Sequence, residues 1–316
     1  RISTPGNYAI YAGGKKGERG RVNLNVEKEN GRYVSTGHTV QIDGHIATNN
    51  LTSVGQWLLG ATDNSGVVNV GLDTPDSYWK GRPFSRTQAV FYKGTSPKTT
   101  IQDNGRINLI LKNGATWFHE GKMAHNKEYH EGIKSAVNSI QGGSGEAHRG
   151  IIYQKDNQEI RIRSLRGHTM AYFDRDGTDV EKILGGDIKV YSAVSERDGS
   201  HASMTLRTDN TGLTLTDEGQ VERVLDNLAH KLIYTGYAEG HRALEGRVEI
   251  AEGLTAQSAQ KSGYIAFDEK TGQGSFSKTK TETKETGSLH QSVVLNGNKD
   301  ISVDDKDNIL FYNAAL

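Results

Sequence analysis

Hydrophobic and polar residues alternate along many short stretches of this chain, and the clearest is Gly105–Trp117, with the sequence GRINLILKNGATW. Ile107, Leu109 and Leu111 occupy every second position there, with polar side chains among the residues between them. This period of two is typical of a strand with one dry face. The asparagine and glycine of the following Lys112–Gly114 segment favour a turn.

A five-residue pattern of the same kind recurs: glycine, any residue, isoleucine or valine, any residue, apolar residue. It begins at Gly20, Gly66, Gly105, Gly186, Gly246 and Gly263. The starts are separated by 46, 39, 81, 60 and 17 residues, which lie near multiples of about 20, a scale on which solenoid repeats are found. We therefore predict an all-β chain whose strands stack in repeating turns, a β-solenoid. A β-sandwich or an irregular barrel is the alternative that the pattern leaves open.

One stretch has helical periodicity instead. Its apolar residues recur at helical spacing, as Val221, Val224, Leu225, Leu228 and Leu232. Asp217, with Gln220 three residues later, forms an N-terminal cap signal. We predict a short amphipathic helix over 218–234 that packs beside the solenoid.

The strand pattern fails after Trp117. Residues 118–158 have little periodicity and contain four histidines, His119, His125, His130 and His148. In a solenoid such a segment is typical of a loop that projects from one face. We therefore predict one solenoid domain over residues 1–316, with a loop insertion at about 118–158.

Composition agrees with a long and narrow body. Hydrophobic residues make up 34% of the chain and the mean hydropathy is -0.64, low for a rounded globule but natural where each thin turn exposes half of its side chains. Lysine plus arginine and aspartate plus glutamate both number 38, so no overall field attracts nucleic acid or an anionic bilayer. The chain has no cysteine, which excludes disulfides and thiolate chemistry. No apolar run approaches the length of about 18 residues that spans a bilayer.

Motifs for catalysis and metal binding are weak. The phrase GGSGE at 142–146 lacks the closing glycine of a nucleophile elbow. The aspartates of 172–180 do not have the spacing of a calcium loop, and the histidines of 119–130 lack a helical spacing for zinc. We expect no catalytic residue, no metal and no cofactor.

One enzymatic alternative stays open, which is polysaccharide cleavage by a lyase or a glycoside hydrolase. β-Solenoid enzymes can place carboxylates on neighbouring turns, which lie about 4.8 Å apart, close to the spacing of about 5 Å that retaining glycosidases use. Asp187 with Asp209, or Glu249 with Asp268, could stack in this way.

Two groups of residues are candidate ligand-binding sites. The first is one tryptophan and three cations of a polar loop, Trp79, Lys80, Arg82 and Arg86. Stacking and cation–π contact could hold a sugar or an acidic partner there. The alternative is that the ring closes the end of a turn and the cations are solvated.

The second group is a small basic ladder. It consists of arginines on one predicted strand and just beyond it, Arg161, Arg163 and Arg166. The first two project on the same side of the strand and could bind an anion or a glycan. Nearby acids such as Glu159 could instead neutralise them as an ordinary solvated face.

Several phrases in residues 58–117 and 186–274 resemble the sequences of one protein family. They are LLGATDNSGVVNVGL, SYWKG, INLILKNGATW, GDIKVYSA, ASMTLRTDNTG, VLDNLAHKLIYTGYAEG, LEGRVEIAEGLTAQSA and IAFDEKTGQG. This text resembles the passenger domains of type V autotransporters, of the pertactin and AIDA-like adhesin kind, from Gram-negative outer membranes.

The resemblance implies a right-handed parallel β-helix that is exported through a C-terminal membrane barrel and displayed on the cell surface. The family offers no shared catalytic residues. Because we find neither a signal peptide nor a barrel, we expect an excised passenger. We therefore expect a non-enzymatic adhesin whose partner is a host surface or matrix protein, a glycan, or another copy of itself, with roles in attachment, autoaggregation or biofilm growth.

Overall fold

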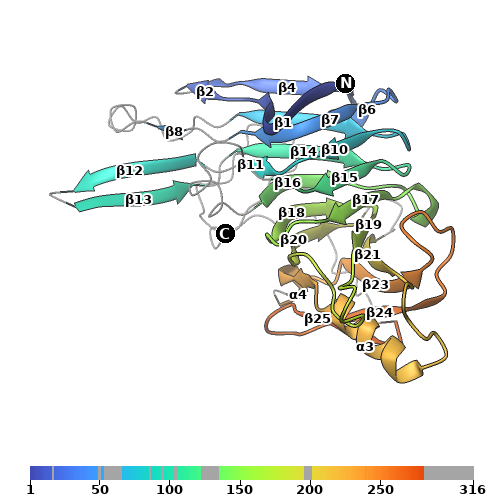
Figure 1. Ribbon diagram of the computed structural model, residues 1–316. Coiled ribbons are helices and arrows are strands. Elements are labelled where there is room, and N and C mark those ends of the chain that lie inside the picture. Colours follow the sequence, from blue (N-terminus) through green and yellow to red (C-terminus); the bar gives the residue numbers. More distant parts are fainter. Residues whose placement is uncertain are drawn as a thin grey trace.

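Two long sheets dominate the computed structural model (Figure 1). The structure describes residues 1–15, 18–48, 51–52, 66–84, 87–93, 96–102, 105–121, 135–195, 201–238 and 240–280. The eleven-stranded sheet runs in spatial order through β1 (Ile2–Tyr11), β7 (Gln41–Ala47), β10 (Tyr78–Lys80), β15 (Thr116–His119), β17 (Gly150–Gln154), β19 (His168–Phe173), β21 (Ala202–Asp209), β23 (Leu244–Ala251), β24 (Lys261–Phe267) and β25 (Gly274–Ser277), with β11 (Pro83–Phe84) beside β7. The seven-stranded sheet runs through β22 (Leu232–Tyr234), β20 (Ile188–Val194), β18 (Ile160–Arg166), β16 (Ser135–Gln141), β14 (Arg106–Leu111), β9 (Val67–Leu72) and β4 (Arg21–Leu24).

Smaller elements lie outside these two sheets, which together we call the stack. They are the hairpins β2 (Gly14–Lys15) with β3 (Glu18–Arg19) and β5 (Val26–Glu29) with β6 (Arg32–Ser35), the three strands β8 (Leu51–Thr52), β12 (Thr87–Lys93) and β13 (Ser96–Gln102), the 3-10 turn η1 (Glu146–His148), and the helices α3 (Glu218–Ala229) and α4 (Thr235–Ala238). Figure 1 shows β12 and β13 projecting from one side of the stack. Among the described residues, no helix has both the length and the apolar character needed to cross a membrane.

Successive strands of the stack alternate between the two sheets along the chain, and neighbours within each sheet are parallel from β1 to β23. This confirms the prediction of an all-β chain with stacked strands, and it differs from the antiparallel sandwich that the pattern left open. The eleven-stranded sheet is nevertheless mixed, because β23, β24 and β25 pair antiparallel.

The dry face predicted for the strand that carries Ile107 and Leu109 is confirmed, and it is part of one buried column. Ile107 and Leu109 of β14 lie in register with Val68 and Val70 of β9, and all four side chains are buried in one continuous core. The residue between each pair of core residues, such as Asn108 between Ile107 and Leu109, is polar and faces away from the core. Apolar residues at every second position therefore stack on the same residue type one turn away, as period-two strands require.

The eleven-stranded sheet faces this column with a pair of stacked indoles. Trp79 of β10 lies over Trp117 of β15, with ring centroids 4.8 Å apart and planes inclined by 6°. The indole N–H of Trp79 donates to the carbonyl of Gly44 at 2.9 Å, and that of Trp117 donates to Gly81 at 3.0 Å. Both rings are fully buried with their polar atoms satisfied, as buried tryptophan needs.

The expected repeat of about 20 residues is wrong. Arg21 pairs with Val67 and Val67 pairs with Arg106, so single turns take 46 and then 39 residues. Ser135 pairs with Ile160, so a later turn takes 25. Turn length varies because loops of different size leave the stack between the same two sheets, while the register of the strands is kept.

Close backbone approach explains the leading glycine where β4 and β9 begin. A Cβ at Gly66 would lie 2.3 Å from the carbonyl oxygen of Ala12, and one at Gly20 would lie 2.1 Å from that of Gly13. No side chain fits at such a distance, so glycine is required by the neighbouring turn. The glycine-led phrases at 246 and 263 differ, because they lie inside β23 and β24 of the other sheet.

The predicted insertion over 118–158 needs correction, because 135–141 and 150–154 form β16 and β17 of the two sheets. Residues 122–134 lie outside the described part. In β16 the core-facing residues Val137 and Ile140 are three apart, and the pairing with β18 skips Asn138 together with Arg163 at an unchanged offset of 25 residues. The spacing of three breaks the period of two and hides the strand in the sequence.

The predicted side helix is confirmed as α3, although it is shorter than expected because β22 begins at Leu232. The Asp217 carboxylate accepts from the backbone N–H of Gln220 at 3.0 Å, which is the predicted cap. The apolar face of α3 joins the core through Val221, Val224 and Leu228. Together with β24 and β25, the helix covers the C-terminal end of the stack (Figure 1).

His119 is a fully buried histidine. The imidazole of His119 is hydrogen-bonded to the Gln154 side chain at 2.6 Å and to the Ser135 hydroxyl at 2.8 Å, and it meets Trp117 edge-on. Burial lowers the pKa of His119 from 6.5 to about 4, against the opposing effects of the bond to Gln154 and the charge of Asp156. The ring is therefore neutral at pH 7.

We predict that replacing Trp117 by alanine lowers the free energy of unfolding by about 3–5 kcal/mol. The change removes the stack on Trp79 and leaves a cavity and an unpaired carbonyl at Gly81. Trp117→Phe keeps a ring in place and should cost less. Denaturant titration followed by circular dichroism measures both variants, and an alanine variant as stable as the parent protein would contradict the buried stack.

We also predict that His119 makes the fold less stable in acid. As pH falls from about 6.5 to about 4, the unfolded chain binds a proton at His119 that the folded chain does not. The free energy of unfolding falls by about 3 kcal/mol across this window. It falls no further at lower pH, because His119 is then protonated in both the folded and the unfolded state. Unfolding free energies of the parent and of His119→Gln should therefore converge between pH 7 and pH 4, and parallel curves would refute the assignment.

Candidate functional site

The register that stacks the core also stacks the side chains facing outward. On the outer face of the eleven-stranded sheet, Phe118 lies beside Tyr153, and Tyr153 lies beside Tyr172. Tyr78 joins the row at its other end, so that the ring centroids are 6.5, 5.7 and 5.0 Å apart in turn. We call Tyr78, Phe118, Tyr153 and Tyr172 the aromatic ladder.

Only part of the ladder reaches solvent. Tyr78, Phe118 and Tyr153 are half-buried, and we call these three residues the platform. Tyr172 is only 4% exposed, because it packs with Met170 in a small cluster to which Leu254 is added. The loop that follows β23 therefore closes one end of the ladder.

An ion cluster holds this closing loop in place. The Arg207 guanidinium is buried, and it donates to the carbonyls of Leu254 at 3.4 Å and Ala256 at 2.8 Å. The same group donates to Glu249 at 2.8 Å, and Arg149 approaches that carboxylate at 3.4 Å. One carboxylate thus pairs with two arginines beneath the loop, a geometry that is costly to break.

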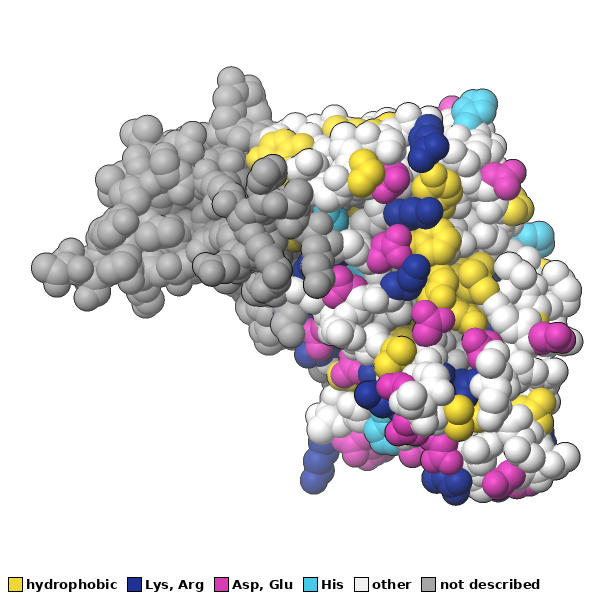
Figure 2. Space-filling model, viewed as in Figure 1, with side chains coloured by type: hydrophobic (Ala, Val, Ile, Leu, Met, Phe, Trp, Pro, Cys, Tyr) yellow, Lys and Arg dark blue, Asp and Glu magenta, His cyan; other side chains and the backbone are white. Residues whose placement is uncertain are grey.

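Charges along the platform are matched. The Lys80 ammonium lies 5.1 Å from the centre of the Tyr78 ring and 5.5 Å from that of Phe118, and Asp43 is its neighbour in register. Lys155 lies over Tyr153 at 5.3 Å and pairs with Glu120 at 3.0 Å. Figure 2 shows hydrophobic side chains gathered over β10, β15 and β17, with basic and acidic side chains alternating beside them.

A hydrogen-bonding end adjoins the platform. The Tyr153 hydroxyl donates to the Asp174 carboxylate at 2.7 Å, and the Tyr172 hydroxyl donates to Asp209 at 3.3 Å. Burial raises the pKa of Tyr153, and the bond to Asp174 raises it further. The phenol therefore stays protonated and donates at neutral pH.

The prediction that a ligand stacks on Trp79 is wrong. Its ring is fully buried against Trp117, so no ligand can reach it, and it fills the core instead of closing the end of a turn. The period of two places Trp79 on the same side as core residues such as Ile42, its partner in register.

The cations of that predicted binding site lie in different environments. Arg82 is buried, with a hydrogen bond to Gln158 and an ion pair to Asp156 at 4.0 Å, so it is a structural group and not a solvated one. Lys80 alone reaches the platform. Arg86 lies outside the described residues.

The predicted basic ladder is not an open anion site. Arg161 pairs with Glu159 at 2.7 Å, as the neutralised alternative expects. Arg163 is 3% exposed, and Arg166 is half-buried. A surface ligand therefore meets no row of available guanidinium groups on β18.

Neither predicted carboxylate pair forms. Asp187 precedes β20 in one sheet, whereas Asp209 ends β21 in the other. Glu249 lies opposite Ser262, so Asp268 is six residues, or roughly 20 Å, further along its strand. Hydrogen bonds from Thr271 hold the pKa of Asp268 low, which does not suit a general acid.

The weak metal motifs also have structural explanations. The nitrogens of His119 are bonded to Gln154 and Ser135, while His125 and His130 lie outside the described residues. Asp176 accepts from Thr178 within its own turn. In the part of the chain that the structure describes, no group of three or more acidic or histidine side chains could hold a metal ion.

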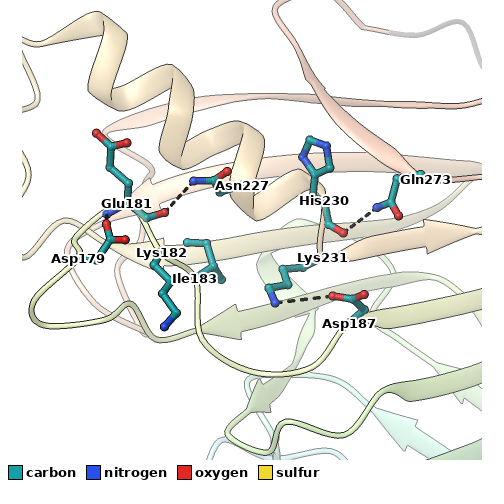
Figure 3. A pocket seen from close by; sticks show the side chains of 9 residues that line it. All are labelled: Asp179, Glu181, Lys182, Ile183, Asp187, Asn227, His230, Lys231 and Gln273. Carbon is teal, nitrogen blue, oxygen red and sulfur yellow. Dashed lines mark hydrogen bonds and ion pairs between the residues drawn. The ribbon is translucent and has the colours of Figure 1, made fainter.

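A polar hollow of about 530 Å³ lies between α3 and the loop before β20 (Figure 3). Lys231 crosses it to the carbonyl of Gly185 at 2.7 Å and to Asp187 at 3.6 Å. On its rim, Gln273 donates to the carbonyl of His230 at 2.7 Å. These bonds connect the loop before β20 with the segments that follow α3 and precede β25. We therefore assign the hollow a structural role.

Comparison with known proteins adds no assignment. No family model matches the chain, and neither a curated protein nor a solved structure matches it. The resemblance to autotransporter passengers therefore stays a prediction from the sequence phrases.

We predict that Glu249→Gln lowers the free energy of unfolding by about 3 kcal/mol, because it leaves Arg207 and Arg149 without their shared carboxylate. Limited proteolysis should then cut within 252–260. The matched control is Glu269→Gln, whose side chain is 80% exposed and pairs with Arg242, and which should change stability by about 0.5 kcal/mol or less. Equal effects of the two variants would show that the buried cluster does not hold the loop.

Proposed function

We propose that this chain is the passenger domain of a Gram-negative cell-surface adhesin, wound as a right-handed parallel β-helix, which attaches cells to host surfaces or to copies of itself. Two kinds of observation support this proposal. The parallel strands alternate between two sheets from β1 to β23, and the quoted phrases resemble those of such passengers. The winding and the place on the cell surface follow from the resemblance.

The platform is the single observation that carries a binding role. Three aromatic rings, Tyr78, Phe118 and Tyr153, stand in a row on the outside of a hydrogen-bonded sheet. Aromatic residues are enriched where proteins recognise partners. Because the rings are carried on strands and not on a loop, their spacing is fixed before a partner arrives, which reduces the entropy lost on binding.

Binding without cleavage is the better supported alternative. The carboxylate pairs that would have served glycan cleavage are separated in the structure. Glu249 is held by two arginines, Arg149 and Arg207. The acidic groups beside the platform accept a hydrogen bond from a phenol or pair with lysine, as Asp174 and Glu120 do.

The test uses beads coated with the full chain, with attachment to cultured epithelial cells and bead-to-bead aggregation counted separately. We predict that Tyr78→Ala combined with Phe118→Ala reduces one or both counts at least several-fold. The control is Tyr11→Ala, which removes a 51% exposed aromatic ring from β1, away from the platform. A platform variant that attaches and aggregates like the parent chain would refute the proposal.

A further inference from the structure

We infer that the platform binds an uncharged glycan, with pyranose rings stacked on Tyr78, Phe118 and Tyr153. This inference rests on the proposed function, and it names the partner class of the same site. The face of a pyranose carries C–H groups and its rim carries hydroxyls. Such a ligand needs aromatic faces with hydrogen-bonding groups beside them, which is the composition of this part of the sheet.

The charge pattern selects against ionic partners. An anionic chain would approach Asp43, Glu120 and Asp174, which lie among or beside the three rings. A cationic chain would meet Lys80 and Lys155, whose ammonium groups lie over those rings. Because each lysine has a carboxylate neighbour, the platform has no field of one sign to steer a charged ligand.

The hydrogen-bonding groups match hydroxyls. The Lys80 and Lys155 ammonium groups each offer three donors, and they sit on flexible stems that can swing off the rings. The carboxylates of Asp43 and Glu120 are acceptors at the same edge. Donors and acceptors therefore alternate along the platform, as the hydroxyl rim of a sugar requires.

The size of the platform sets the length of the bound segment. The rings come from β10, β15 and β17, which are consecutive strands, so the row extends over roughly 10 Å. Beyond Tyr153 the loop carrying Leu254 covers Tyr172. A segment of about two or three sugar units fits this length, and the closing loop blocks its extension at one end.

Saturation-transfer NMR on the full chain tests the inference. The probes are neutral hexasaccharides of α-1,4-glucose, β-1,4-glucose and β-1,4-mannose, each at about 1 mM, with an α-1,4-galacturonate hexasaccharide as the charged comparison. We expect at least one neutral probe to bind more tightly than the uronate and to keep its affinity between low and high salt. Failure of every neutral probe, or tighter binding of the uronate, would overturn the inference.

Three substitutions separate stacking from other contacts. Phe118→Ala should weaken binding roughly tenfold. Phe118→Leu should weaken it by a similar factor, because leucine keeps apolar bulk but has no ring face. Lys189→Gln is the control and should leave affinity within about twofold, because Lys189 lies 5.1 Å from the Tyr191 ring on β20 of the other sheet. Full binding by the leucine variant would assign the site to plain hydrophobic contact and refute glycan stacking.

The bead assay keeps this inference separate from the proposed function. Cells oxidised with periodate, which opens sugar rings, should lose attachment by the parent chain. If attachment persists on these cells but still depends on Phe118, the adhesin role stands and the glycan is wrong. If neither attachment nor bead-to-bead aggregation depends on Phe118, both proposals fail. Bead-to-bead aggregation that depends on Phe118 but resists added hexasaccharides would assign the platform to a second copy of this chain.

Discussion

Hydrogen-bonded register between parallel strands is the constraint on which this structure depends. Each strand lies about 4.8 Å from the next, so a side chain that points inward must fill the space between its counterparts one turn away. Trp79 over Trp117 and Val68 beside Ile107 are the result. The core can therefore extend along one axis, with each layer making most of its contacts to its nearest neighbours.

The same register organises the outer faces. On the seven-stranded sheet, Asn69 donates to Asn23, Asn108 donates to Asn69, and Asn138 donates to Asn108, each at 2.8 Å. On the eleven-stranded sheet the equivalent positions hold the aromatic ladder. A polar ladder satisfies its own donors, whereas half-buried rings leave apolar surface for a partner. The second face is therefore the one suited to recognition.

The two ends and the loops are less constrained than the strands. Turn length can vary because only the paired residues must keep register, and excursions such as β5–β6 leave without disturbing the stack. At the C-terminal end, α3 and the antiparallel strands cover the core, so the last apolar layer is not left open to water. The loop carrying Leu254 belongs to this end, so the capping region also limits the platform.

Local sequence patterns were sufficient to specify individual strands and one helix. Alternation at Ile107 and Leu109 specified a strand with one dry face, and the apolar spacing after Asp217 specified a capped helix. Both signals involve only residues that are close together in the sequence. Such patterns could not reveal β16, where core-facing residues are three apart instead of two. The sequence also placed Trp79 in a ligand site, since composition alone does not tell which side of a strand is dry.

The candidate site, in contrast, forms only when strands that are distant in the sequence pair in the fold. Phe118, Tyr153 and Tyr172 are separated by 35 and then 19 residues, as their pairing shows, and no fixed period links them. They become neighbours because strands from different turns pair in a particular register. Loops of different length separate the paired strands, so local sequence patterns do not encode which residues will meet.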